Sequence, residues 1–280
     1  MKMTKVLPIL AVALCVPGVV LRALHMLNGF DIATGLPTVG DAWLWYFTML
    51  LVASAVAYAI LAAPLRTKKS VPFEQLLGTE STGFRMAAVI AGLLLFAGGL
   101  FYLYLTITTV EEDAAGWARA LEIAYSAVTV ACGICMVALA RAQGSEMTAQ
   151  SAMLTLVPLL WSCLHLLVNY RMTCVDPILA SFAFGLVADV LVVLAFYHLA
   201  RLLYGKPRPA AFAFFSAIAT TMAVSDLGGV GLSSLMGMST LDWSAKMLLR
   251  GGLSVAACVF LAAELAILCG RAAAPAQGLE

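Results

Sequence analysis

The chain has 280 residues, of which 63% are hydrophobic and 11% are charged, and its mean hydropathy is +0.99. Soluble domains contain roughly 45–50% apolar residues, so this composition excludes an ordinary soluble domain and predicts a polytopic protein of the lipid bilayer. The formal net charge of +1 gives no broad basic face, and we expect no nucleic-acid partner.

Eight apolar stretches come close to the roughly 20 residues that a helix needs to cross a bilayer. They predict an all-α, eight-transmembrane-helix bundle that forms a single transmembrane domain over residues 1–280. The expected helices lie at about 6–27, 43–63, 84–108, 118–141, 152–170, 178–204, 210–227 and 247–269.

The distribution of lysine and arginine predicts the orientation, because positive loops stay on the cytoplasmic side. With the N-terminus inside, most of the 16 basic residues are cytoplasmic: Lys2, Lys5, Arg66, Lys68, Lys69, Arg85, Arg141, Arg201, Lys206, Arg208 and Arg271. The outer ends carry fewer basic residues, and tryptophans at helix starts act there as interfacial anchors: Trp43, Trp45, Trp117 and Trp243. We expect both termini in the cytoplasm and a multi-pass protein of the plasma membrane.

Polar residues interrupt the outer part of the first helix. Arg22, His25 and Asn28 follow at spacings of three, so they form one slowly winding stripe that needs protein or water beside it. The stripe predicts that the first helix contributes to an outward-facing polar pocket.

Other outer helix halves also carry polar and ionisable side chains. They are Glu122, Tyr125, His165, Asn169, Asp226 and Arg250. We predict that they line this pocket, formed mainly by the helices at 6–27, 118–141, 152–170, 210–227 and 247–269. Snorkelling to the interface or structural pairing is the alternative explanation, and for Glu122 and Arg250 an interhelical ion pair.

Asp189 lies about eleven residues into the sixth helix, on the order of 16 Å along its axis and therefore near the bilayer centre. A carboxyl group at that depth must be protonated or partnered. The functional interpretation is a proton-coupling or cation-binding group beneath the pocket. The alternative is a neutral acid that hydrogen-bonds a neighbouring helix. Glu264 is similarly buried, closer to the cytoplasmic face.

A glycine-rich run, residues 228–234, directly follows Asp226. We expect an external loop here, since the seventh helix can already reach the outer interface at Asp226. The alternative is a helix broken at membrane depth, whose free backbone groups would meet a substrate or ion.

Two segments resemble each other: residues 17–30, PGVVLRALHMLNGF, and residues 158–170, PLLWSCLHLLVNY. Both contain Leu-His-x-Leu. Either two parallel four-helix repeats, over 1–150 and 151–280, or chance similarity within a restricted membrane alphabet accounts for this pattern.

The matched His25 and His165 raise the hypothesis of a bis-histidine haem, although hydrogen-bonded structural histidines are the favoured interpretation. Cys132 and Cys135 have redox-motif spacing, but within an apolar helix this spacing is more typical of packing. We expect no cofactor, no metal site and no catalytic residue, and we lean against an enzyme.

The stretch from Arg22 to Pro37, which ends in Phe-Asp-x-x-Thr-Gly-Leu-Pro, and the helix from Val157 to Tyr170 together resemble uncharacterised multi-pass membrane proteins of anaerobic Gram-positive bacteria. That group has no assigned activity, so the resemblance implies only the membrane class.

Three functions fit these patterns. The leading hypothesis is a membrane protein that binds or transports a small molecule or ion through the polar pocket. The second is the membrane anchor of a redox enzyme, binding quinone or haem. The third is a structural or signalling partner of other membrane proteins, which includes self-association as a homo-oligomer.

Overall fold

The structure, a computed structural model, describes residues 3–31, 34, 36–66, 73–109, 116–144, 149–174, 179–204, 206–236 and 244–272. Within these ranges the chain is helical, and eight helices are long and apolar enough to cross a membrane. The predicted all-α, eight-helix membrane bundle is therefore confirmed.

The helix bounds agree with the sequence prediction to within a few residues, except in the seventh span. The eight spanning helices are α1 Val6–Asn28, α2 Ala42–Ala62, α4 Thr82–Thr108, α5 Gly116–Ala142, α7 Leu156–Thr173, α8 Leu179–Leu203, α9 Pro209–Leu235 and α10 Ala245–Ala272. Four short helices complete the order: η1 Met3–Lys5, η2 Ala63–Leu65, α3 Phe73–Leu76 and α6 Ala149–Met153.

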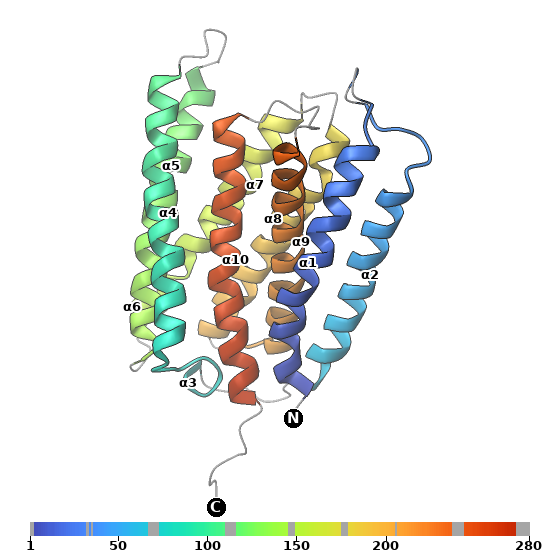
Figure 1. The fold of residues 1–280 in the computed structure, drawn as a ribbon. Helices are drawn as coiled ribbons and strands as arrows, with labels where there is room; N and C mark the ends of the chain where they lie inside the picture. Colours follow the sequence, from blue (N-terminus) through green and yellow to red (C-terminus); the bar gives the residue numbers. More distant parts are fainter. Residues whose placement is uncertain are drawn as a thin grey trace, which may run out of the picture.

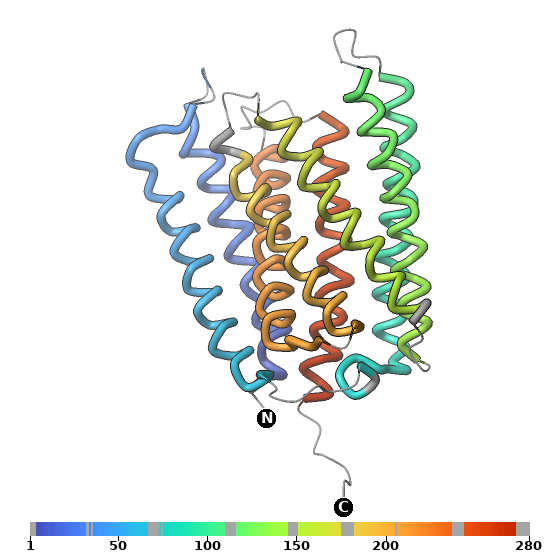
Figure 2. The backbone as a smooth tube through the Cα atoms, turned by 180° about the vertical axis from the view of Figure 1, so that it is seen from behind, coloured from blue at the N-terminus to red at the C-terminus, as the bar shows by residue number. Residues whose placement is uncertain are grey.

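The helices run alternately up and down, and α1 begins at the same end of the bundle at which α10 finishes (Figure 1). We call this the terminal end and the opposite end the distal end. Helix α9 lies at the centre and packs against α1, α2, α8 and α10. Helices α4 and α5 form a pair at one side, while α7 and α8 cover the rear face (Figure 2).

Helix α9 continues through the glycine-rich run to Leu235. The expected external loop is therefore wrong, and so is the alternative of a broken helix. A bilayer favours the intact helix, because a helix satisfies every backbone hydrogen bond internally. The small residues also allow close helix contact: a Cβ atom at Gly229 would lie 2.5 Å from Cβ of Arg22 on α1.

Basic residues that the sequence groups on one side of the membrane lie at one end of the bundle, where the structure describes them. Arg66, Arg141, Arg201 and Arg271 lie at the terminal end, at the last residues of η2, α5, α8 and α10 or next to them. Lys2, Lys68, Lys69 and Trp243 lie outside the described residues. The assignment of the terminal end to the cytoplasm stays a prediction, and so does the division into two repeats.

Candidate functional site

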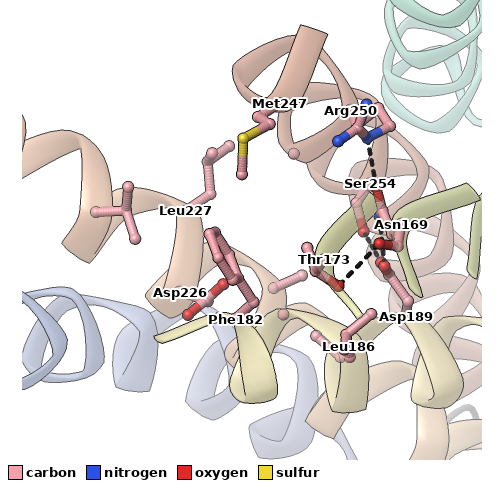
Figure 3. A pocket seen from close by; sticks show the side chains of 15 residues that line it. Asn169, Thr173, Phe182, Leu186, Asp189, Asp226, Leu227, Met247, Arg250 and Ser254 are labelled. Carbon is pink, nitrogen blue, oxygen red and sulfur yellow. Dashed lines mark hydrogen bonds between the residues drawn. The ribbon is translucent and has the colours of Figure 1, made fainter. Parts of the chain in front are cut away.

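Helices α7, α8, α9 and α10 line a pocket in the distal half of the bundle, with a cavity volume of about 80 Å³. One part of its wall is apolar, formed by Phe182, Leu186, Leu227, Val230 and Met247. The polar part consists of Asn169, Thr173, Asp189, Asp226, Arg250 and Ser254. Figure 3 shows Asp226 on one side of this space and the group around Asp189 and Arg250 on the other.

Both carboxylate oxygens of Asp189 accept hydrogen bonds from neighbouring helices. Asn169 Nδ2 donates to Oδ2 at 2.6 Å, and Ser254 Oγ donates to Oδ1 at 3.1 Å. Asp189 is 5% exposed and lines the pocket. Of the two states that the sequence allowed, protonated or partnered, the structure gives a partnered carboxyl group in contact with the pocket.

His165 connects Asp189 to a buried tyrosine. Its Nδ1 lies 2.8 Å from the Tyr125 hydroxyl, and its Nε2 lies 3.0 Å from Asn169 Nδ2 and 3.3 Å from Asp189 Oδ1. In the neutral ring, Nε2 accepts from Asn169 and Nδ1 donates to Tyr125. A proton added at Nε2 would instead point to the Asp189 carboxylate. The arrangement can therefore hold a proton on either His165 or Asp189.

Arg250 approaches the same group from α10. Its Nε donates to Asn169 Oδ1 at 2.6 Å and its Nη1 donates to the Tyr102 hydroxyl at 3.2 Å. Asn169 thus presents its oxygen to a cation and its amide nitrogen to an anion. The sequence prediction did not include Tyr102 or Ser254. For Ser254 the sequence carries a signal, because Lys246, Arg250 and Ser254 are spaced four residues apart and therefore share one face of α10.

Asp226 forms the opposite side of the pocket and pairs with α1. Arg22 Nε donates to its Oδ1 at 2.8 Å, and the Arg22 side chain is fully buried. The guanidinium carbon lies 5.0 Å from the ring centre of Phe184 and 6.0 Å from that of Phe47. A Cβ atom at Gly185 would lie 2.8 Å from Asp226 Oδ2, so only glycine leaves this oxygen its present space.

His25 stands behind Arg22 rather than in the pocket. Its Nδ1 lies 2.9 Å from Arg22 Nη1, and its Nε2 lies 3.7 Å from Asp41 Oδ2. Asp41 is also the N-cap of α2, where its oxygens accept from the backbone N–H groups of Trp43 and Leu44 at 2.9 and 3.1 Å. The sequence prediction did not include Asp41, although an acid directly before an apolar helix is typical of an N-cap.

Glu122 belongs to a separate ion pair near the distal end. Lys246 Nζ donates to Glu122 Oε2 at 2.9 Å, and Thr106 Oγ1 donates to the same oxygen at 3.3 Å. The expected interhelical ion pair therefore exists for Glu122, but its partner is Lys246. Arg250, one helical turn further along α10, bonds Asn169 and Tyr102 instead.

The sequence-predicted site divides into three groups. Asn169, Asp189, Asp226 and Arg250 line the pocket, and these four come from α7 to α10. Another four lie behind the pocket or beside it. Arg22 and His165 bond the pocket residues Asp226 and Asn169, and His25 and Tyr125 in turn bond Arg22 and His165. Glu122 forms the separate pair, and Asn28 is exposed and donates to the Leu24 carbonyl of its own helix at 2.8 Å.

Glu264 lies towards the terminal end, away from the pocket. It is fully buried, and Nε2 of Gln143, the residue that follows α5, donates to its Oε1. Its Oε2 and the Gln143 Oε1 have no hydrogen-bond partner in the described part of the chain. The second buried acid of the sequence is therefore a structural partner of α5 that does not line the pocket.

His25 and His165 lie in different hydrogen-bond networks, each with its own acid. Among the described residues, no group of three or more His, Cys, Asp and Glu side chains could hold a metal ion. All seven cysteines are free, and Cys132 is buried in the apolar core.

Comparison of the chain with protein-family models, with curated proteins and with solved structures gives no match. The pocket geometry is therefore the basis for the function.

Proposed function

We propose that the protein binds a small molecule in the pocket between α7, α8, α9 and α10, and that Asp189 exchanges a proton as the pocket fills. The observation that carries this proposal is the pair of polar walls that face one space in the distal half of a membrane bundle. Charged side chains are costly at membrane depth, so we infer a functional reason for a pocket that retains several of them.

Two atoms on opposite walls define the chemistry of the ligand. Asp226 Oδ2 and Arg250 Nη2 form no hydrogen bond within the described ranges, whereas the other polar atoms of these two groups are partnered. A ligand that donates to Asp226 and accepts from Arg250 would satisfy both. Its body would lie against Phe182, Leu227 and Met247, so a compact molecule with one donor, one acceptor and an apolar centre fits best.

The contacts of Asp189 support the proton exchange. Asp189 lies on the pocket wall, and His165 provides a second protonatable group 3.3 Å from its Oδ1. Tyr125 continues the chain of hydrogen bonds away from the pocket. A proton that the ligand gains or releases can therefore come from or go to Asp189 or His165, and no water needs to enter the membrane interior.

The test is to identify a molecule that remains bound through purification. Mass spectrometry of the intact complex should show one small molecule per chain in the wild type. Met247→Trp, which fills the pocket, should remove it. Leu167→Trp is the matched control, because Leu167 is 49% exposed on the outer surface of α7, and it should retain the molecule. Equal retention in both variants would contradict the proposal.

A quinol is the second candidate ligand, in keeping with a redox membrane anchor. The apolar wall and the two opposed hydrogen-bonding groups match a flat ring with two hydroxyls, one donating to Asp226 and the other accepting from Arg250. A short-chain hydroquinone should then raise the unfolding temperature of the wild type but not of Met247→Trp. Transport across the plasma membrane remains the proposal for a ligand that is not redox active, and uptake into proteoliposomes tests it.

A further inference from the structure

A second hollow lies at the terminal end, between the last turn of α2 with η2 and the first turns of α9. Its volume is about 440 Å³. Its walls are apolar and include Ala59, Ala62, Phe214 and Phe215. Ala59 is exposed, so the hollow is a groove on the surface that the bundle presents to lipid.

Two arginines stand at one end of this groove. Arg66 follows η2 and Arg208 is the N-cap residue of α9, and both side chains are exposed. Neither guanidinium forms an ion pair or hydrogen bond with another described residue. Two unpaired cations beside an apolar channel complement a ligand with an anionic head and an apolar tail.

The position of the groove along the helices fits the layers of a bilayer. Arg208 lies at the helix end, and Phe215 lies seven residues further along α9, about 10 Å deeper. The polar interfacial layer on each side of a bilayer is roughly 5–8 Å thick, so the arginines reach headgroup level while the phenylalanines reach the hydrocarbon. The ring of Phe215 stacks on that of His198 on α8, with ring centres 5.3 Å apart and planes nearly parallel.

We propose that this groove binds an anionic phospholipid, with the headgroup phosphate between Arg66 and Arg208 and an acyl chain against α2 and α9. Guanidinium groups suit this task because their parallel N–H donors match phosphate oxygens in pairs. Basic pockets between membrane helices are a general means of recognising anionic headgroups. The site is separate from the distal pocket and does not depend on the proposed function.

The experiment uses the full-length protein in mild detergent, with equal amounts of phosphatidylglycerol and phosphatidylcholine of the same acyl chains. Mass spectrometry of the intact protein measures the ratio of the two lipid adducts. The Arg66→Gln/Arg208→Gln double variant should lower the preference for phosphatidylglycerol by roughly tenfold. Arg141→Gln is the matched control, an exposed arginine at the same end on α5, and should leave the ratio unchanged.

A second variant separates the lipid from a free anion. Ala59→Phe narrows the apolar part of the groove and should weaken both lipid adducts while leaving their ratio nearly unchanged. An unchanged ratio in the double variant, or an equal loss in Arg141→Gln, would overturn the proposal. So would displacement of phosphatidylglycerol by millimolar inorganic phosphate, since that result would assign the arginines to a soluble anion. Because all of the substituted side chains are exposed, gel filtration should show each variant folded.

Discussion

Asn169 on α7 and Asp189 on α8 are joined by a 2.6 Å hydrogen bond from Nδ2 to Oδ2, while the other end of the same amide accepts from Arg250. The amide therefore has one orientation, with its oxygen towards the cation and its nitrogen towards the anion. Through this single side chain, α7, α8 and α10 form one hydrogen-bonded unit on the pocket wall.

Removing this amide should destabilise the bundle. Asn169→Leu leaves Asp189 Oδ2 and Arg250 Nε without their partners, and an unsatisfied buried polar group costs about 1–3 kcal/mol. Thermal unfolding in detergent should show a clear decrease in unfolding temperature. Asn28→Leu is the control, because the Asn28 side chain is exposed and donates only to its own helix, and this variant should unfold near the wild-type temperature.

The ion pair of Glu122 and Lys246 should behave as a buried pair, since both side chains are at most 10% exposed. Glu122→Gln removes one charge of this pair, and breaking a buried ion pair from one side costs about 3–5 kcal/mol. The double variant Glu122→Gln/Lys246→Met should recover most of that loss in the same unfolding assay. A double variant as unstable as the single one would argue against direct pairing.

Gly229 should tolerate no side chain. Gly229→Ala places a Cβ atom 2.5 Å from the Arg22 side chain, and overpacking of this kind costs about 1–3 kcal/mol. Gly231→Ala, two residues away on the same helix, meets no atom within 4 Å and should be neutral or slightly stabilising. The difference between the two unfolding temperatures measures the α1–α9 contact directly.

The orientation in the membrane can be tested with a maleimide that does not cross membranes. In a background lacking the other cysteines, Cys174 at the distal end of α7 should react in intact cells, because it is exposed and predicted to lie outside. Arg141→Cys in a chain without Cys174 should react only after permeabilisation. The opposite pattern would place the distal pocket on the cytoplasmic side.

The sequence predicted the number and approximate ends of the spanning helices, because bilayer thickness sets their length and lipid sets their composition. It failed at residues 228–234 because glycine signals a loop in water, whereas in lipid the same residues allow α9 to pack closely on Arg22 of α1.

The site was only partly predictable for a different reason. Charge and depth identified Arg22, Asp189 and Arg250 as residues that need partners, but which helices meet is a property of the fold. The sequence therefore grouped Arg22 and His25 with the pocket, while the structure assigns them to the support of Asp226. Tyr102 carried no charge and so gave no signal, although it accepts directly from Arg250.

The central claim is that protonation at Asp189 is coupled to occupation of the pocket. Because coupling between two bound species is reciprocal, retention of the copurified molecule must depend on pH if a proton at Asp189 affects its affinity. The measurement is the bound fraction, determined by mass spectrometry across a pH series. The wild type and Glu264→Gln, whose acid lies away from the pocket, should show the same pH dependence. Asp189→Asn, which has the shape of the protonated acid, should show a bound fraction that is constant with pH. A pH dependence in Asp189→Asn equal to that of the wild type would contradict the claim.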